Sequence, residues 1–278
     1  MHRRAVRNLA KLDSTQARIT RIFDAAAGGK NNFLLDKATV RHFDQVTPAI
    51  TTAARAVLQF LSRVVRHLAA DEGVDQFMIV GSGVPSGLSA GHRLHDIARR
   101  ASANPDLRVV YVENDPMVVT MAQATIEPFT DLVRVVEGDV REIDEMLGDP
   151  VIHTFLDWDR PLAVLLLSTY SLDDDEYAHY VIKRLRHIAP MGSFLGLLHT
   201  TFDSIPPELL PAIRDLLAMT LPGLTIRSRD EVAALLDGLD LVEPGLVWVP
   251  QWRPAERDLA CRDQPGSSGN YGAVARIP

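Results

Sequence analysis

The chain has 278 residues, which is long enough for one large α/β domain or two small ones. Its hydrophobic content of 46% and charged content of 23% are typical of a globular protein with a packed core. The 36 acidic residues outnumber the 29 Lys and Arg residues, and the resulting net charge of −7 argues against a broad nucleic-acid-binding surface.

The basic N-terminal stretch lacks the apolar core that a secretory signal requires. No apolar run approaches the roughly 18 residues of a membrane span. Cys261 is the single cysteine, so no intrachain disulfide can form, and no neighbouring pattern marks it as a nucleophile. These features predict a cytoplasmic protein that does not enter a membrane.

The first 70 residues have helical patterns. The stretch DSTQARITRIFDAAAGG predicts a helix that begins with Asp13 or Ser14 as its N-cap and ends at Gly28-Gly29. A second helix is predicted over residues 51–73, because apolar residues recur there at every third or fourth position. Between the two helices, Lys30 is either a solvated residue at a helix end or a cation that reaches an anionic ligand group.

Five short apolar runs follow, with helical stretches between them, over residues 77–81, 108–113, 133–139, 162–168 and 193–199. Continuous apolar runs are typical of strands that are covered on both faces. Their alternation with helices predicts a doubly wound, mostly parallel sheet. The last two segments, LVEPGLVWVPQW and NYGAVARIP, have no convincing helix between them. We expect them to form an antiparallel pair at one edge of the sheet.

The first of these strands ends in the glycine turn Gly81-Ser82-Gly83. Glycine allows a positive φ and the close approach of a ligand, and the next helix offers free N–H groups. A dinucleotide site requires a third glycine where this chain has Ser86, and a P-loop requires a Gly-Lys-Ser/Thr sequence that is absent. S-adenosylmethionine is the third candidate ligand, because it has no pyrophosphate to bind.

Acidic and polar residues stand at the ends of the next strands. Glu113 and Asn114 end the second strand, where an acid can accept hydrogen bonds from ribose hydroxyls, and Asp115 fits the N-cap of the helix that Pro116 opens. Asp139 and Val140 follow the third strand, where the carboxylate can accept from an adenine amino group or can cap a turn. Ser168 ends the fourth strand, and residues 173–176 are an acidic, solvated helix start.

Together these segments resemble an actinobacterial family of S-adenosylmethionine-dependent methyltransferases that was long known as a domain of unknown function. The resemblance covers nearly the whole chain. The segments that carry it are ARITRIFDAAAGGKNNFLLDK, QFMIVGSGVP, RVVYVENDPMVV, LAVLLLS, GLDLVEPGLVWVPQWRP and YGAVARI. Of these, GGKNNF and VVYVENDP are the more specific, whereas the glycine turn occurs in many families.

The resemblance implies a Rossmann-like class I methyltransferase sheet, mostly parallel with an antiparallel final edge strand. It also implies a helical N-terminal cap over residues 1–72, followed by the methyltransferase domain over residues 73–278. S-adenosylmethionine is the implied cofactor. The implied binding residues are Gly81, Ser82 and Gly83 under its methionine part, Glu113 and Asn114 at the ribose, Asp139 and Val140 at the adenine, and Ser168, Gly29 and Lys30 around them.

Two features depart from the family pattern. Family members usually carry Asp two residues before the first glycine, and Ile79 stands there in this chain. The loss of one charge-assisted contact of about 1.5–3 kcal/mol predicts weaker cofactor binding. In addition, the turn between Pro85 and His95 looks longer than in the family, which predicts a reshaped pocket floor.

Methyl transfer needs a general base only where the acceptor must lose a proton. His199, at the end of the fifth strand, is the candidate base, although a packed core histidine is the alternative. His92, His95 and Asp96 have no further ligand at a recognised spacing, so no metal site is predicted.

The sequence therefore predicts a methyltransferase with a small-molecule acceptor and no nucleic-acid partner. The alternatives are a cofactor-binding protein without catalysis and, with less support from the motif, a nicotinamide oxidoreductase. The sequence does not determine the oligomeric state, and a homo-oligomer is one of the possibilities.

Overall fold

The computed structural model describes residues 13–46, 50–81 and 92–278. One mixed sheet runs through it in the order β3-β2-β1-β4-β5-β8-β6, and β7 also pairs with β8. The strands are β1 (Gln76–Val80), β2 (Arg108–Glu113), β3 (Val133–Glu137), β4 (Ala163–Leu166), β5 (Phe194–Thr200), β6 (Asp240–Leu241), β7 (Val247–Trp248) and β8 (Asn270–Arg276).

The five predicted apolar runs form β1 to β5, and these five strands pair in parallel. Ile79 of β1, for example, lies between Tyr111 of β2 and Leu165 of β4. The order reverses between β1 and β4, because the chain first builds outward from β1 to β3 and then returns to the other side of β1. In such sheets, ligands bind outside the strand ends at the point of reversal.

The predicted antiparallel pairing at one side of the sheet is present, but its details differ from the prediction. β8 runs antiparallel to β5 over its full length, from Phe194 opposite Arg276 to Thr200 opposite Asn270. The segment expected as its single partner forms two short strands, β6 and β7, on the other side of β8. Pro244 and Gly245 lie between these strands, and proline cannot donate a ladder hydrogen bond.

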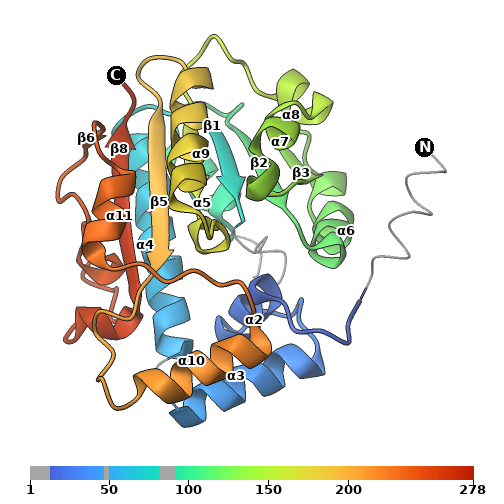
Figure 1. The fold of residues 1–278 in the computed structure, drawn as a ribbon. Coiled ribbons are helices and arrows are strands. Elements are labelled where there is room, and N and C mark those ends of the chain that lie inside the picture. The colour runs from blue at the N-terminus through green and yellow to red at the C-terminus, as the bar shows by residue number, and fades with distance from the viewer. Residues whose placement is uncertain (1–12, 47–49, 82–91) are drawn as a thin grey trace.

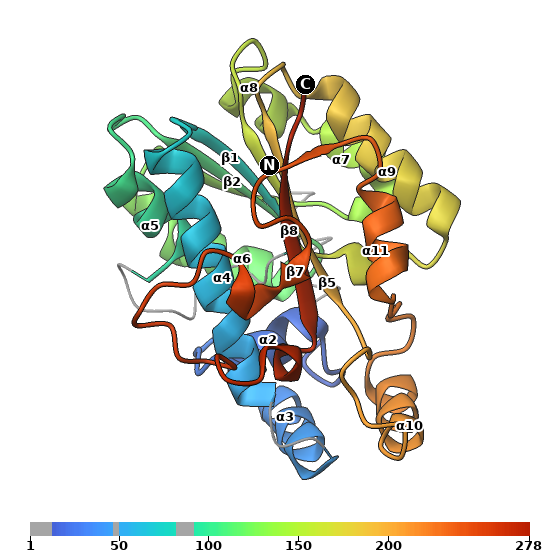
Figure 2. The same ribbon diagram turned by 90° about the vertical axis from the view of Figure 1, so that its left-hand side faces the viewer.

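Helices cover both faces of the sheet (Figures 1 and 2). α4 (Ile50–Ala70), α5 (Leu94–Ala101) and α6 (Pro116–Thr125) share one hydrophobic core with Phe77 and Ile79 of β1. The alternate residues, Met78 and Val80, face a second core. Its helices are α7 (Ile143–Leu147), α8 (Pro150–Phe155), α9 (Asp175–Ile188) and α11 (Arg229–Leu235). Burial on both faces explains why the strands are continuously apolar.

Three further helices gather beyond the C-terminal ends of the parallel strands: α2 (Ile19–Ala26), α3 (Leu34–Val46) and α10 (Leu210–Thr220) (Figure 1). α3 contacts both α2 and α10, and α2 also contacts α4. Leu221, at the end of α10, packs against the small core that Ile22 and Ala26 of α2 form with Ala54 of α4. The strand ends that carry the predicted ligand residues are therefore covered by two N-terminal helices and by α10, which lies far from them in the sequence.

The predicted start of the first helix is wrong. α2 begins at Ile19, with Arg18 in the N-cap position and no side-chain cap. Asp13 instead closes a local turn, because its Oδ1 accepts from the backbone N (2.7 Å) and the hydroxyl (2.5 Å) of Thr15. The predicted end is confirmed, since the helix stops at Ala26 and Gly28 has a φ of 81°.

The division of the chain at residue 72 stays a prediction. α4 lies before that boundary, and its residues Phe60 and Leu68 share a core with Phe77 of β1. Within the described residues, no helix is both long enough and apolar enough to cross a membrane.

Candidate functional site

A cavity of roughly 300 Å³ opens at the reversal point, beyond the ends of β1 to β4. Gly81, Glu113, Asp139 and Ser168, from the ends of four neighbouring strands, line it. Residues 16–20 before and within α2, and residues 220–224 after α10, line the opposite side. We call this the first cavity. Six of the predicted cofactor residues come together in it: Gly81, Glu113, Asn114, Asp139, Val140 and Ser168.

Gly81 is fixed by two constraints at once. Its φ is +73°, a conformation that L side chains rarely adopt, and a Cβ atom there would stand 2.2 Å from Ser168 Cβ. Its backbone N donates to Val112 O at 2.9 Å, which continues the β1–β2 pairing into the turn. The position therefore needs glycine to keep β1 and β4 close and to leave the cavity floor open.

The exchange Gly81→Ala is expected to destabilise the protein. The left-handed conformation costs about 1–2 kcal/mol for a non-glycine residue, and the contact with Ser168 adds an overpacking cost of about 1–3 kcal/mol. Urea unfolding measures the sum. Gly73→Ala is the matched control, because Gly73 also has a positive φ of 69° but has no atom within 4 Å of the new Cβ. Equal losses in the two variants would show that Ser168 does not constrain the turn.

Glu113 is the most unusual group in the first cavity. The residue is only 1% exposed. Oε1 accepts from Thr20 Oγ1 (3.2 Å), Asn114 N (2.9 Å) and Asp115 N (3.1 Å), whereas Oε2 has no partner among the described residues. Burial, together with the neighbouring Asp115 charge, raises the pKa of Glu113 to about 7. A buried acceptor without a partner is costly, and it is satisfied when a ligand supplies the donor.

The end of β3 is held by a charged pair. Arg141 Nε donates to Asp139 Oδ1 (3.0 Å) and Arg141 Nη2 donates to Oδ2 (2.6 Å), while Asn114 Nδ2 reaches Oδ2 at 3.3 Å. After the burial that opposes it, the hydrogen bonds of Arg141 are the main reason that the pKa of Asp139 is lowered. Val140 is buried beside this pair. The arrangement presents a fixed carboxylate and an apolar side chain at the cavity wall.

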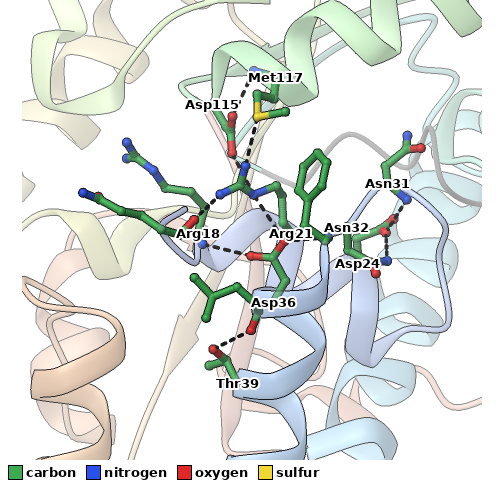
Figure 3. A network of polar contacts seen from close by, with 12 residues as sticks. Arg18, Arg21, Asp24, Asn31, Asn32, Asp36, Thr39, Asp115 and Met117 are labelled. Atoms are coloured by element: carbon green, nitrogen blue, oxygen red, sulfur yellow. Dashed lines mark hydrogen bonds and ion pairs between the residues drawn. The ribbon is translucent and has the colours of Figure 1, made fainter. Parts of the chain in front are cut away.

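Asp115 caps α6, as predicted, by accepting from Met117 N at 2.9 Å. It also faces Arg21 of α2, whose guanidinium lies between Asp115 and Asp36 of α3 (Figure 3). Arg21 Nε is 3.4 Å from Asp115 Oδ2 and 3.5 Å from Asp36 Oδ2, and all three side chains are almost completely buried. This ion-pair network therefore joins two cap helices to the strand end that carries Glu113.

A second, smaller cavity of roughly 190 Å³ adjoins the first. The two share Ile19, Thr20, Gly81 and Tyr170. The second cavity lies between α2, α4 and the ends of β4, β5 and β8, and its lining is mainly aliphatic. Its polar side chains are Thr20, Tyr170, Thr200 and Asn270.

Sequence reasoning missed Thr20, Arg18, Tyr170 and residues 220–224. Thr20 is a buried polar residue on the first helix, and Tyr170 lies two residues after Ser168 in the segment that follows β4. A polar residue next to a strand end is a sign of a ligand site, so the sequence was sufficient to predict Tyr170 as a site residue. No local pattern marks residues 220–224, which are brought to the cavity by the docking of α10 against α3.

Four predicted site residues either line neither cavity or lie outside the described residues. Ser82 and Gly83 lie outside the described residues. Lys30 is exposed, and Gly29 packs against Asp24, whose Oδ2 accepts from Asn31 N (2.8 Å) and Asn32 Nδ2 (2.7 Å) (Figure 3). Neither Gly29 nor Lys30 is among the described residues that line the two cavities.

His199 also lines neither cavity. Its Nδ1 is 2.6 Å from Thr169 Oγ1, which donates its own proton to Leu198 O at 2.6 Å, so Nδ1 is the donor to Thr169. Burial, and secondly the charge of Arg227, lower the pKa of His199 to about 3. A base role for His199 stays a prediction.

The sheet order, Gly81 at the end of β1 and the acidic end of β2 are those of a Rossmann-like protein with the class I methyltransferase fold. The chain belongs to the S-adenosyl methyltransferase family, which it matches over residues 5–278.

Two solved structures are similar over the same length. A proposed methyltransferase of Thermobifida fusca YX is 30% identical with a TM-score of 0.84, covering 96% of this chain and 97% of that one. A DUF574 family protein of Streptomyces avermitilis MA-4680 is 31% identical with a TM-score of 0.84, covering 96% and 100%. The comparison with curated proteins found no match.

Proposed function

We propose that the first cavity binds S-adenosylmethionine and that the protein transfers its methyl group to a small-molecule acceptor. The observation that carries this proposal is the unpartnered Oε2 of Glu113, buried at the point where the strand order reverses. A ribose hydroxyl is a donor of the right kind for this atom. Gly81 would then pass beneath the methionine part, and Asp139 with Val140 would receive the adenine.

The charge of the first cavity supports this ligand. Its described lining contains the carboxylates of Glu113, Asp115, Asp139 and Asp173 but, as cations, only two arginines, Arg18 and Arg141. S-adenosylmethionine carries a sulfonium, an ammonium and a carboxylate, so its net charge is positive and complements the acidic excess. A dinucleotide carries negative phosphates and fits the same lining less well.

The bound cofactor supplies a methyl group on a positively charged sulfur. The protein has to hold the two partners in line and exclude water. Tyr170 lines both cavities and stands where the two ligands would meet. Its pKa is raised by burial and by the charges of Glu113 and Asp139, so the phenol stays neutral. We therefore propose that Tyr170 positions the partners without taking a proton.

Calorimetric titration with S-adenosylhomocysteine tests the cofactor proposal. We expect one molecule to bind per chain and to raise the melting temperature in proportion to the logarithm of its concentration. No heat and no thermal protection at millimolar ligand would contradict it. Binding without turnover over a broad panel of acceptors would instead favour the non-catalytic alternative, in which Ile79 marks lost function.

Gly29, Lys30, Ser82, Gly83 and His199 stay proposals for the same site. An unchanged cofactor Kd in Lys30→Ala would remove Lys30 from the cofactor site. Full turnover by His199→Gln would dismiss the base role.

A further inference from the structure

The second cavity adjoins the proposed cofactor site, and the chemistry of its lining restricts what it can bind. Ile22 and Phe23 of α2, Ala54 and Leu61 of α4, and Leu198 of β5 form an apolar wall. The cavity is smaller than the about 300–1,000 Å³ of a site for a drug-sized ligand. It therefore suits a small, mainly apolar molecule that reaches the first cavity beside Gly81 and Tyr170.

The described lining of the second cavity contains no Asp, Glu, His, Lys, Arg or Cys. Residues 47–49 and 82–91, which adjoin the lining residues Ile50 and Gly81 in the chain, also contain none in the sequence. The remaining titratable side chain of the described lining is Tyr170, which stays neutral because burial raises its pKa. No general base is thus available from this lining to remove a proton from the acceptor.

Desolvation has opposite effects on the two common kinds of acceptor. An apolar cavity disfavours the charged form of any group, so it raises the pKa of a bound phenol or alcohol and lowers the pKa of a bound amine. An oxygen acceptor becomes a poorer nucleophile there without a base. An amine gives up its extra proton to water on entry and arrives with a free lone pair.

We propose that the second cavity binds the neutral form of a small, mainly apolar amine as the methyl acceptor. This proposal rests on the proposed function of the first cavity. In the transfer, the amine lone pair forms the new N–C bond, while the S–C bond breaks and leaves its electron pair on sulfur. The positive charge passes to the nitrogen, and the product ammonium releases its proton to water.

The polar groups of the second cavity suit the N–H donors of such an amine. Thr200 Oγ1 donates to Asn270 Oδ1 at 3.1 Å, and Thr20 Oγ1 donates to Glu113 Oε1 at 3.2 Å. With their single protons used in this way, both hydroxyl oxygens offer lone pairs as acceptors. An amine can donate N–H bonds to them while its own lone pair stays free.

Binding of 2-aminoindane to the protein saturated with S-adenosylhomocysteine tests the proposal without measuring activity. 2-Aminoindane is an ammonium ion at pH 8, so binding of its neutral form must release about one proton per molecule, since alkyl ammonium groups have pKa values near 10. Calorimetry in two buffers of different ionisation enthalpy measures that proton. 2-Indanol has the same apolar skeleton, and we expect it to bind without proton release.

Variants locate the binding. Ala54→Phe fills the second cavity from α4, and Ala53→Phe does so from a half-buried position if the first variant folds poorly. We expect at least a tenfold loss of 2-aminoindane affinity in either one with unchanged binding of S-adenosylhomocysteine. Thr52→Phe is the matched control, because Thr52 is exposed on the same helix and lines neither cavity.

Two results would overturn the proposal while leaving the cofactor site intact. One is binding of 2-aminoindane without proton release, and the other is no binding in protein that binds S-adenosylhomocysteine. Failure of S-adenosylhomocysteine itself to bind would instead contradict the proposed function of the first cavity.

Discussion

Replacement of Glu113 by alanine is expected to raise the Kd of S-adenosylhomocysteine by about ten- to a hundredfold, measured by calorimetry at pH 8. A hydrogen bond to a charged group contributes about 1.5–3 kcal/mol net, and the unpartnered Oε2 is the atom that a ribose hydroxyl would meet. The loss should be large because Glu113 Oε2 is buried with neither a hydrogen bond nor an ion pair among the described residues. Asp115 Oδ2 of the same cavity also lacks a hydrogen bond, but it lies 3.4 Å from Arg21 Nε.

The matched control for this experiment is Glu137→Ala. Glu137 lies opposite Glu113 in the β2–β3 register, at the end of the neighbouring strand, but it is exposed and does not line the first cavity. Its replacement should leave the Kd unchanged. Equal effects of the two exchanges would mean that Glu113 acts only through the general acidity of this edge.

The raised pKa of Glu113 makes binding depend on pH. With a pKa of about 7, the carboxyl is mostly protonated at pH 6 and mostly ionised at pH 8. Because the ionised form is the better acceptor, affinity should fall by up to about tenfold between pH 8 and pH 6, with proton release on binding at pH 6. 5′-Methylthioadenosine is the suitable ligand, since it keeps the adenine and the ribose hydroxyls but lacks the titratable amino and carboxyl groups of the amino-acid part. Glu113→Gln should abolish the dependence.

The raised pKa of Glu113 also affects the stability of the unliganded protein, but in the opposite direction: stability falls as the pH rises, whereas affinity increases. Burial favours the protonated carboxyl, so its contribution to stability is present below its ordinary pKa of 4.5 and is lost as the pH rises through about 7. In the unliganded protein the ionised Glu113 is thus buried without a full set of hydrogen-bond donors, and a bound ligand would supply the missing donor.

Much of the fold was readable from the sequence because its strands are buried on both faces. Residues such as Met78 and Ile79 have to be apolar whichever core they face, and this produced the continuous runs. Pro116 after Asp115 marked the α6 start correctly, since a proline at the first helical position and an acid before it act locally.

The first cavity was predicted on one side only. Glu113, Asp139 and Ser168 follow strands that the parallel sheet brings to a single edge, so their proximity follows from the topology. The opposite wall consists of residues 16–20 and 220–224, and their position depends on how α2, α3 and α10 dock. Docking of these helices depends on contacts between segments that are distant in the sequence, and the spacing of residues along the chain does not reveal such contacts. The misplaced start of α2 has a local cause instead, because the Asp13 carboxylate accepts hydrogen bonds from Thr15 in a turn and does not cap the helix.

Replacement of Arg21 by methionine is expected to destabilise the protein by about 3–5 kcal/mol, measured by urea unfolding. Methionine retains much of the apolar volume but leaves Asp36 and Asp115, both almost fully buried, without their shared cation. Four other contacts of Arg21 are lost as well, among them the hydrogen bond from Nη1 to Met117 Sδ at 3.2 Å. Arg21 donates to the backbone oxygens of Asp13 and Gln16, and its guanidinium lies 5.2 Å from the centre of the Phe33 ring.

The effect should be specific to this buried network and should reach the first cavity. Arg41→Met, at an exposed position on α3, is the matched control and should change stability by less than about 0.5 kcal/mol. Adding Asp36→Asn to Arg21→Met removes one orphaned charge and should recover part of the loss. Because α2 also carries Thr20, which donates to Glu113, the single variant should bind S-adenosylhomocysteine more weakly even where it is folded. A folded Arg21→Met protein with unchanged stability and unchanged Kd would show that the cap helices are held over the strand ends by apolar packing alone.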